Sequence, residues 1–179
     1  MKEIAQAYLH EMTGNPTASF HKDQWESIDE LVNKQNQLLV VQRTGWGKSA
    51  VYFIATKIRR SQSFGPTLII SPLLSLIRNQ IDSAAKLGLK VVSYNSSMDK
   101  SERQIAENQI LASQVDAIIV APEQLGQTYF AENILTRISG SVGLFVVDEA
   151  HCISDWGHDF RPDYGRIVRV LQNMPKNMP

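Results

Sequence analysis

Short apolar runs alternate with amphipathic segments along most of the chain. Continuous runs rich in β-branched residues are typical of strands covered on both faces, as in a parallel sheet. Turn-rich stretches separate the runs, and no internal repeat interrupts their order. We therefore predict five strands, at residues 38–41, 67–70, 90–93, 117–120 and 144–147.

Helical spacing fills intervals between these runs. Within residues 51–58, apolar side chains recur at i, i+3 and i+7. A second stripe over residues 73–81 is mostly apolar but includes Gln80, and we expect Ser71 to cap this helix with Pro72 in its first turn. The alternation predicts an α/β fold with a mostly parallel sheet flanked by helices on both faces.

Length and composition place few limits on function. The 179 residues suit one domain, and 43% hydrophobic with 20% charged residues is ordinary for a globular protein. The apolar runs are too short to cross a bilayer, and residues 1–6 lack the apolar stretch of a secretory signal. The single cysteine, Cys152, excludes an internal disulfide. We expect a cytoplasmic protein with no membrane partner.

Net charge gives no general argument for nucleic-acid binding, because 18 basic and 18 acidic side chains cancel. Any contact with DNA therefore needs a local basic groove. Scattered basic residues can form such a groove or simply a solvated face, and the second reading is the commoner one. The candidates are Arg59, Arg60, Arg78, Lys86 and Lys90.

Residues 42–49 carry the strongest chemical signal. They read Gln-Arg-Thr-Gly-Trp-Gly-Lys-Ser, which places a glycine turn between a predicted strand and a predicted helix. This arrangement binds phosphate through backbone amides, while Lys48 supplies charge to the outer phosphates and the Ser49 hydroxyl can ligate magnesium. The alternative is a glycine turn that caps a helix beside an exposed lysine. The candidate nucleotide contacts are Thr44, Gly45, Trp46, Gly47, Lys48 and Ser49.

Two carboxylates follow the last apolar run. Asp148 and Glu149 would stand at the carboxyl end of a strand, where open α/β sheets bind ligands. We expect Asp148 to hold hydrated magnesium and Glu149 to orient and deprotonate an attacking water. The alternative is an acidic strand end in solvent.

The histidines beyond these carboxylates have two readings. His151, Cys152 and His158 are three potential metal ligands, but no fourth stands at a customary spacing, so zinc is not favoured. We instead assign His151 to the catalytic set, as the residue that relays the nucleotide state to the segment after it.

The segment 152–164 concentrates aromatic and basic side chains. Trp156, Phe160 and Arg161 stand together in a stretch punctuated by glycine and proline. Aromatic faces and guanidinium planes stack on the bases of single-stranded nucleic acid. Taken alone, the cluster is as consistent with a small packed loop core.

The run 148–164 resembles the acidic motif of the RecQ-type DNA helicases of superfamily 2, fused to the aromatic-rich loop of that family. Residues 20–24 are similar to its adenine-recognition motif, which makes Gln24 the candidate adenine contact. Residues 71–76 resemble its DNA-backbone motif, and residues 121–125 resemble another motif that contacts the strand. The chain departs from the family pattern at His21, Gln42, Trp46, Gln124 and Asp155.

This resemblance implies a RecA-like P-loop lobe that uses ATP and Mg²⁺. It implies an ATP-dependent 3′–5′ DNA helicase acting on single-stranded or forked DNA. The implied DNA contacts include Ser71, Pro72 and Arg78, together with the aromatic segment. The whole chain, 1–179, would be the first lobe, with residues 1–19 as a helical lead-in.

The resemblance also implies a second RecA-like lobe, in cis or in trans, that supplies an arginine finger. Such a finger contributes roughly 10³ to 10⁵ in rate in related phosphoryl transfers, so we expect this chain to bind nucleotide but hydrolyse it poorly alone. Two other functions remain open. One is an ATP-gated DNA-binding or protein-docking module without unwinding, and the other is an RNA-dependent member of the same superfamily.

Overall fold

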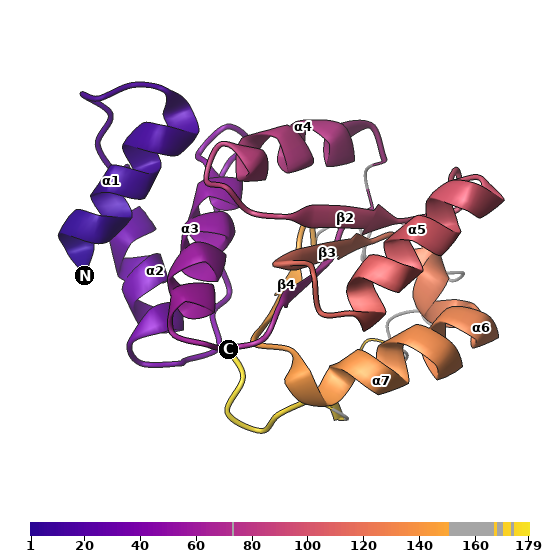
Figure 1. The fold of residues 1–179 in the computed structure, drawn as a ribbon. Helices are drawn as coiled ribbons and strands as arrows, with labels where there is room; N and C mark the ends of the chain where they lie inside the picture. Colours follow the sequence, from indigo (N-terminus) through magenta and orange to yellow (C-terminus); the bar gives the residue numbers. More distant parts are fainter. Residues whose placement is uncertain (73, 151–166, 168–169, 173) are drawn as a thin grey trace.

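Four parallel strands form the central sheet of the computed structural model, which describes residues 1–72, 74–150, 167, 170–172 and 174–179 (Figure 1). The strand order is β2-β3-β1-β4. The sheet is parallel throughout, as predicted, and β1 pairs with both β3 and β4. Its strands are β1 (Thr67–Ile70), β2 (Val91–Tyr94), β3 (Ala117–Val120) and β4 (Leu144–Val147).

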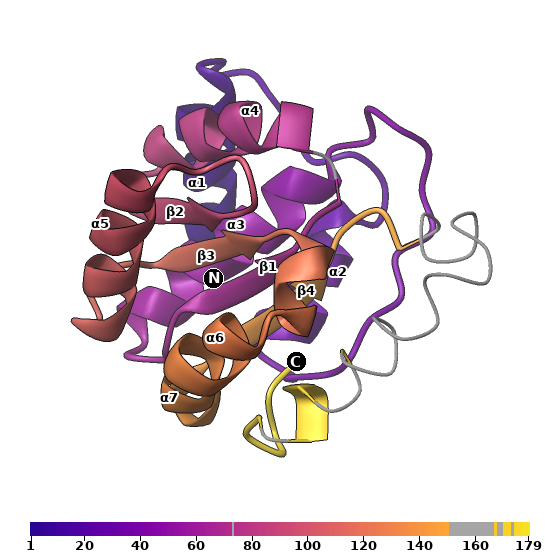
Figure 2. The ribbon, with the colours of Figure 1, turned by 90° about the vertical axis from the view of Figure 1, so that its right-hand side faces the viewer.

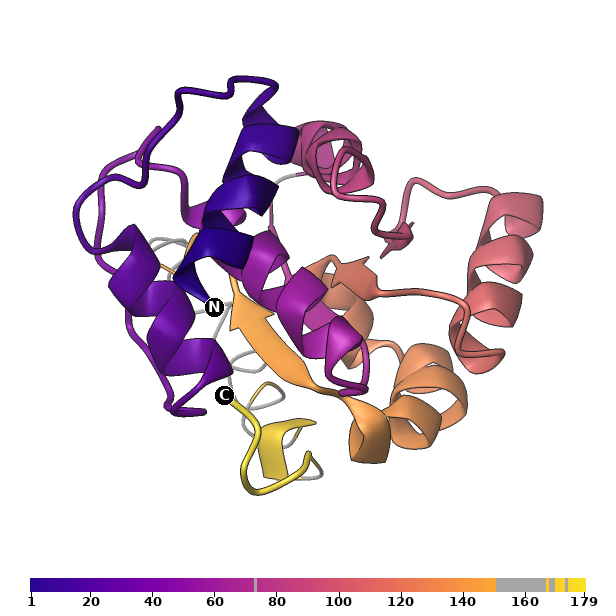
Figure 3. The same ribbon diagram turned by 60° about the vertical axis from the view of Figure 1, so that its left-hand side comes forward.

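The expected strand at 38–41 is wrong for this structure. The segment has no regular secondary structure, and Leu39 and Val41 are 83% and 81% exposed. An apolar cavity of about 300 Å³ lies between this segment and β4. The end of the chain lies near β4 (Figure 3), and the Phe145 N–H of this strand donates to the Pro179 carbonyl at 3.1 Å. The apolar run is present, but the ladder hydrogen bonds that define a strand do not form.

Helices cover both faces of the sheet, as predicted (Figure 2). In that view α4 lies above the sheet while α6 and α7 lie below it. One face carries α1 (Lys2–Thr13), α2 (Gln24–Val32), α3 (Lys48–Ser61) and α4 (Leu74–Ala85). The other carries α5 (Lys100–Leu111), η1 (Pro122–Gly126), α6 (Thr128–Phe130), η2 (Ala131–Leu135), α7 (Thr136–Ile138) and η3 (Ser139–Ser141).

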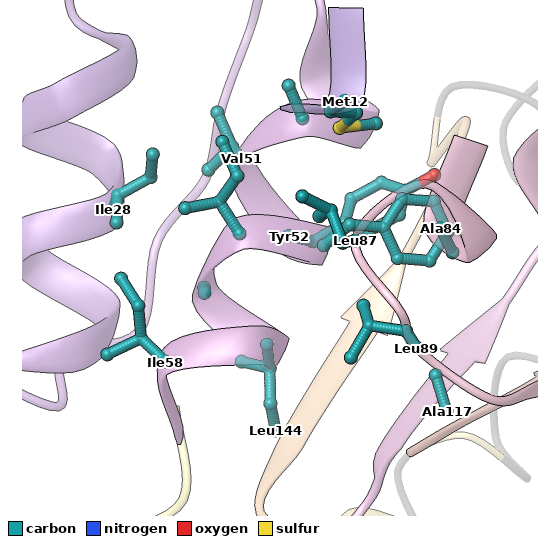
Figure 4. Close-up of a cluster of buried hydrophobic side chains, with 14 of the residues drawn as sticks. Met12, Ile28, Val51, Tyr52, Ile58, Ala84, Leu87, Leu89, Ala117 and Leu144 are labelled. Atoms are coloured by element: carbon teal, nitrogen blue, oxygen red, sulfur yellow. The ribbon is translucent and has the colours of Figure 1, made fainter. Parts of the chain in front are cut away.

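Alternation along the strands divides the core into two halves. Ile69 and Ile119 point toward α1–α4, while Leu68 and Ile118 point toward α5–α7, and all four side chains are fully buried. Figure 4 shows part of the first half, where side chains from α1 to α4 meet Leu144 of β4. Because each strand is covered on both faces, its run is continuously apolar.

One helix start tests the capping prediction, and another shows a complete cap. The α4 helix begins at Leu74, so the expected N-cap at Ser71 is wrong; the buried Ser71 hydroxyl has no hydrogen-bond partner among the described residues. The α5 helix instead has a complete capping box, in which the Asp99 carboxylate accepts from the Glu102 N–H (2.8 Å).

Two of the candidate basic residues are structural. Arg59 is only 2% exposed and donates to the Gly143 carbonyl (2.9 Å) and the Leu31 carbonyl (3.0 Å). It therefore ties the end of α2 to the turn before β4. Arg60 pairs with Asp116 (2.9 Å) at the base of the sheet. These contacts remove both arginines from the predicted DNA groove.

Candidate nucleotide-binding site

The glycine turn of residues 42–47 leads directly into α3. Gly45 and Gly47 have φ angles of 84° and 93°, which residues with a side chain rarely adopt. Since α3 begins at Lys48, the first N–H groups of the helix face the turn, as an anion site requires. The Lys48 ammonium lies across the turn and donates to the Gln42 carbonyl (3.2 Å). These features fit a phosphate group.

Gln24 holds this turn from the neighbouring helix. Its side chain is 2% exposed, its Nε2 donates to the Trp46 carbonyl (2.7 Å), and its Oε1 accepts from the His21 N–H (2.8 Å). A Cβ atom at Gly47 would lie 2.6 Å from this Nε2. The glycine therefore permits both the backbone conformation and the close approach of the amide. The structure places Gln24 against the turn, with its amide occupied by backbone partners.

Trp46 covers the turn. Its side chain is 8% exposed and packs in the hydrophobic core with α1–α3. A hollow of about 500 Å³ opens beside it, and this hollow is bordered by the residues before α2 and by the first half of the turn. The hollow adjoins the region where the resemblance expects an adenine base. Its lining residues are His21, Lys22, Asp23, Gln42, Arg43, Gly45 and Trp46.

Asp148 follows β4 at the carboxyl edge of the sheet. Its backbone N–H donates to the Ile70 carbonyl (2.9 Å), which fixes it beside the end of β1. Its Oδ2 accepts from Gln80 Nε2 (2.8 Å) and from the Tyr52 hydroxyl (3.4 Å), while its Oδ1 accepts from the Glu149 N–H (3.0 Å). Glu149 itself has a φ of 51°, in the left-handed region that residues with a side chain rarely adopt.

The environment of this carboxylate perturbs two pKa values. Burial raises the pKa of Asp148 and the charge of Glu149 raises it further, against the hydrogen bonds that favour the ionised form. Burial also raises the pKa of Tyr52 well above its ordinary value, and the nearby charge of Asp148 adds to the shift. The Tyr52 hydroxyl therefore stays protonated and acts as a donor.

One cavity brings the two motifs together. It has a volume of about 370 Å³ and joins the glycine turn, the carboxylates and one side of α4. Hard oxygen ligands and a nearby phosphate site fit Mg²⁺, which is usually bound by one or two protein oxygens together with phosphates and waters. The lining of this cavity includes Lys48, Ser49, Asp148 and Glu149, together with Gln80 and other residues of α4. Residues 100 positions apart in the sequence therefore border one space, as the two motifs predict.

The predicted DNA contacts divide into three groups. Ser71 is 1% exposed, and its N–H donates to the Val120 carbonyl (3.1 Å). Pro72 is partly buried and Arg78 is exposed, both near the start of α4. The remaining predicted site residues lie outside the described part of the chain: His151, Trp156, Phe160 and Arg161.

Two residues of the site were not predicted from the sequence. Tyr52 lies one turn into α3, where the spacing marks only a core position, and it packs in the cluster of Figure 4. Gln80 stands in the otherwise apolar stripe of α4, and its side chain is 8% exposed. A polar residue within an apolar helix face needs a buried partner. That signal was available at Gln80 and indicates a specific contact, although it does not name Asp148.

Comparison with known proteins assigns the family. Residues 21–178 match the profile of the DEAD/DEAH box helicases, a span that covers the glycine turn and both carboxylates. The chain belongs to the DEAD/DEAH box helicase family. Its Asp148-Glu149-Ala150-His151 sequence is the DEAH form of the motif that gives the family its name.

Similar proteins confirm the resemblance to RecQ-type helicases. The ATP-dependent DNA helicase RecQ of Haemophilus influenzae is 38% identical over 158 residues, which make up 88% of this chain and 24% of that protein. The RecQ of Pasteurella multocida is 36% identical over 98% of this chain and 26% of its own length. This DEAD/DEAH box chain therefore spans about a quarter of the length of these relatives.

A solved structure confirms the RecA-like fold. A hypothetical ATP-dependent RNA helicase from Sulfolobus tokodaii superposes with a TM-score of 0.73 at 21% identity, over 97% of this chain and 48% of that one. No helix within the described ranges of this DEAD/DEAH box chain has the length and apolar character needed to cross a membrane.

Proposed function

We propose that this chain is the ATP-binding and ATP-hydrolysing lobe of a RecQ-like 3′–5′ DNA helicase. The observation that carries the proposal is the shared cavity, in which Lys48 and Ser49 lie with Asp148 and Glu149. Similarity to proteins described as ATP-dependent DNA helicases supports DNA, single-stranded or forked, as the nucleic acid. A soluble enzyme of the cytoplasm is consistent with this role.

The residues have distinct tasks in this proposal. The amides of Gly45 to Lys48 and the Lys48 ammonium bind the phosphates, and Thr44, Trp46 and Ser49 complete the turn. Binding requires the Lys48 ammonium to leave the Gln42 carbonyl, which it contacts at 3.2 Å. Gln24 acts at the adenine side, where its amide must exchange a backbone partner to reach a base.

The acidic pair carries the hydrolytic step. Asp148 and the Ser49 hydroxyl would hold Mg²⁺, which offsets negative charge on the phosphates when bound. Glu149 accepts the proton of the attacking water, and Lys48 stabilises charge on the transferred group. His151 would pass the state of the site to Trp156, Phe160 and Arg161, which would grip DNA with Pro72 and Arg78, whereas Ser71 is too buried to reach a strand in this arrangement.

The proposal also includes a catalytic partner. A second RecA-like lobe, in cis or in trans, would supply the arginine finger, so this chain alone binds nucleotide and turns it over slowly. The test is steady-state ATP hydrolysis by the 179-residue chain, with and without single-stranded DNA, and Lys48→Ala defines the background. We expect ADP binding with turnover near that background.

Two results would overturn the proposal in different ways. Absence of ADP binding to the wild-type chain would refute the nucleotide site. Brisk turnover by a proven monomer would refute the need for a second lobe. If an assembly that contains the chain binds DNA in response to ATP but separates no strands, the chain is a gated binding module instead.

A further inference from the structure

Asp148 is held by a side chain from the opposite wall of the cavity. Gln80 is anchored on α4, and its Nε2 donates to Asp148 Oδ2 at 2.8 Å. The same Nε2 lies 3.2 Å from the Tyr52 hydroxyl, which itself lies 3.4 Å from Asp148 Oδ2. Three side chains from α3, α4 and the end of β4 therefore meet at one carboxylate oxygen.

The orientation of the Gln80 amide is set by charge. The reverse orientation would place Oε1 against a carboxylate oxygen and lose the hydrogen bond. In the observed orientation Oε1 is buried and has no hydrogen-bond partner among the described residues. Buried polar atoms are rarely left unpaired in this way, and each exception needs a physical explanation, such as a catalytic role or a bound water or ion.

A shift of Gln80 would satisfy this oxygen. Gln80 borders the cavity that fits Mg²⁺ and phosphate, and its Oε1 is buried beside this cavity. A water ligand of a metal on Asp148 could donate to Oε1 once the side chain moves toward the cavity. The contact between Gln80 and Asp148 would therefore differ between the nucleotide-free and the metal-bound states.

The position of α4 controls this contact. The helix begins at Leu74, two residues after Pro72, and carries the exposed Arg78. These are DNA contacts in the proposed function, on which this inference rests. A ligand that displaces the start of α4 would move Gln80 relative to Asp148, because Gln80 belongs to this helix whereas Asp148 follows β4. Such differential contact is what couples two sites.

We propose that Gln80 is a positioning residue that orients Asp148 for Mg²⁺ and links the metal site to DNA binding at the start of α4. Tyr52 supports the same oxygen from α3. Neither side chain is required to touch the nucleotide.

The test is equilibrium binding of ADP by calorimetry, with Mg²⁺ and with a chelator in its place. Gln80→Met keeps the length of the side chain and removes both amide atoms. We expect this variant to lose about tenfold in the gain of affinity that Mg²⁺ gives, as outer-shell substitutions do. Its affinity for metal-free ADP should stay within about twofold, since the phosphate turn is untouched.

Controls separate this role from folding. Gln104→Met makes the same substitution on the exposed face of α5, far from the site, and should change neither affinity. If Gln80→Met fails to fold by circular dichroism, Tyr52→Phe carries the test, because it removes only the hydroxyl. A smaller loss of the Mg²⁺ gain is expected there, since the Tyr52 contact is longer.

Coupling to DNA is measured in the same experiment. A single-stranded oligonucleotide should change the affinity of the wild-type chain for ADP with Mg²⁺, and Gln80→Met should abolish that change. An unchanged Mg²⁺ gain in both variants, or no effect of the oligonucleotide on the wild type, refutes the inference. Failure of the wild type to bind ADP at all would instead refute the proposed function.

Discussion

Replacing Gly47 by alanine tests how the phosphate turn is held. Two independent effects act at this position. The backbone has a φ of 93°, which alanine adopts only with strain. The new Cβ would also lie 2.6 Å from Nε2 of the buried Gln24, so the amide must move.

The expected loss of unfolding free energy is the sum of these two effects. A left-handed conformation costs an alanine about 1–2 kcal/mol relative to glycine. Displacing the amide breaks its 2.7 Å hydrogen bond to the Trp46 carbonyl. Leaving such buried groups unpaired costs about 1–3 kcal/mol. We expect Gly47→Ala to lower the free energy of unfolding by about 2–5 kcal/mol.

Urea unfolding followed by circular dichroism measures this difference, and the chain provides a matched control. Gly45 has a φ of 84°, but nothing lies within 4 Å of a Cβ there. Gly45→Ala should therefore carry only the backbone strain of about 1–2 kcal/mol. The two alanine variants separate strain from collision.

A double-mutant cycle with Gln24→Ala isolates the collision. Once the glutamine side chain is gone, Gly47→Ala should add only backbone strain, so the two substitutions should couple by about 1–3 kcal/mol. Additivity of the two free-energy changes within about 0.5 kcal/mol would refute the proposed contact. Equal losses in Gly45→Ala and Gly47→Ala would refute it independently.

Three further substitutions probe the buried polar groups. Arg59→Leu leaves two buried carbonyls without their donor and should lower the unfolding free energy by about 2–5 kcal/mol in urea titrations. Arg60→Ala removes a partly buried ion pair with Asp116 and a hydrogen bond to the Phe64 carbonyl, and should cost less, about 1–2 kcal/mol. A loss in Arg60→Ala as large as that in Arg59→Leu would contradict this assignment. Asp148→Asn should raise the melting temperature of the nucleotide-free chain at neutral pH, because the raised pKa of this carboxyl means that its ionisation opposes folding. That gain should vanish below about pH 3.8, where the unfolded carboxyl is also protonated, and a gain that persists there would exclude the electrostatic cause. Tyr94→Phe removes the 2.7 Å hydrogen bond to buried Glu107 and should destabilise the chain by about 1.5–3 kcal/mol by thermal unfolding, so a neutral variant would show that this bond contributes nothing.

The sequence alone predicted the elements that depend on interactions within a short segment. The apolar runs at 67–70, 117–120 and 144–147 form β1, β3 and β4. A continuous apolar run is the composition of a strand that is buried on both faces, so these strands could be predicted from the sequence. The run predicted at 90–93 is β2, displaced by one residue. Two glycines before a helix likewise predicted a tight turn, and the structure shows why glycine stands there, since both residues have positive φ angles.

Only the tertiary structure shows which segments pair as strands and which polar side chains are buried, because both depend on how the elements pack against one another. Residues 38–41 have the composition of a strand but lack a paired neighbour, and pairing is not a property of the segment itself. The position of Arg59 could not be predicted from the sequence either. Its charge suggested a surface position, but hydrogen bonds to two backbone carbonyls hold it in the core.

The candidate site also combines residues that the sequence predicts with contacts that only the structure shows. The sequence predicts Lys48, Ser49 and Asp148 as site residues by motif, and the structure brings all three to one cavity. The sequence did not identify the partner of Gln80, which lies 68 residues from Asp148 and meets it only because α4 packs beside the end of β4. Local chemistry is fixed by residue type and spacing, whereas contacts across the fold depend on the sum of many weak packing interactions.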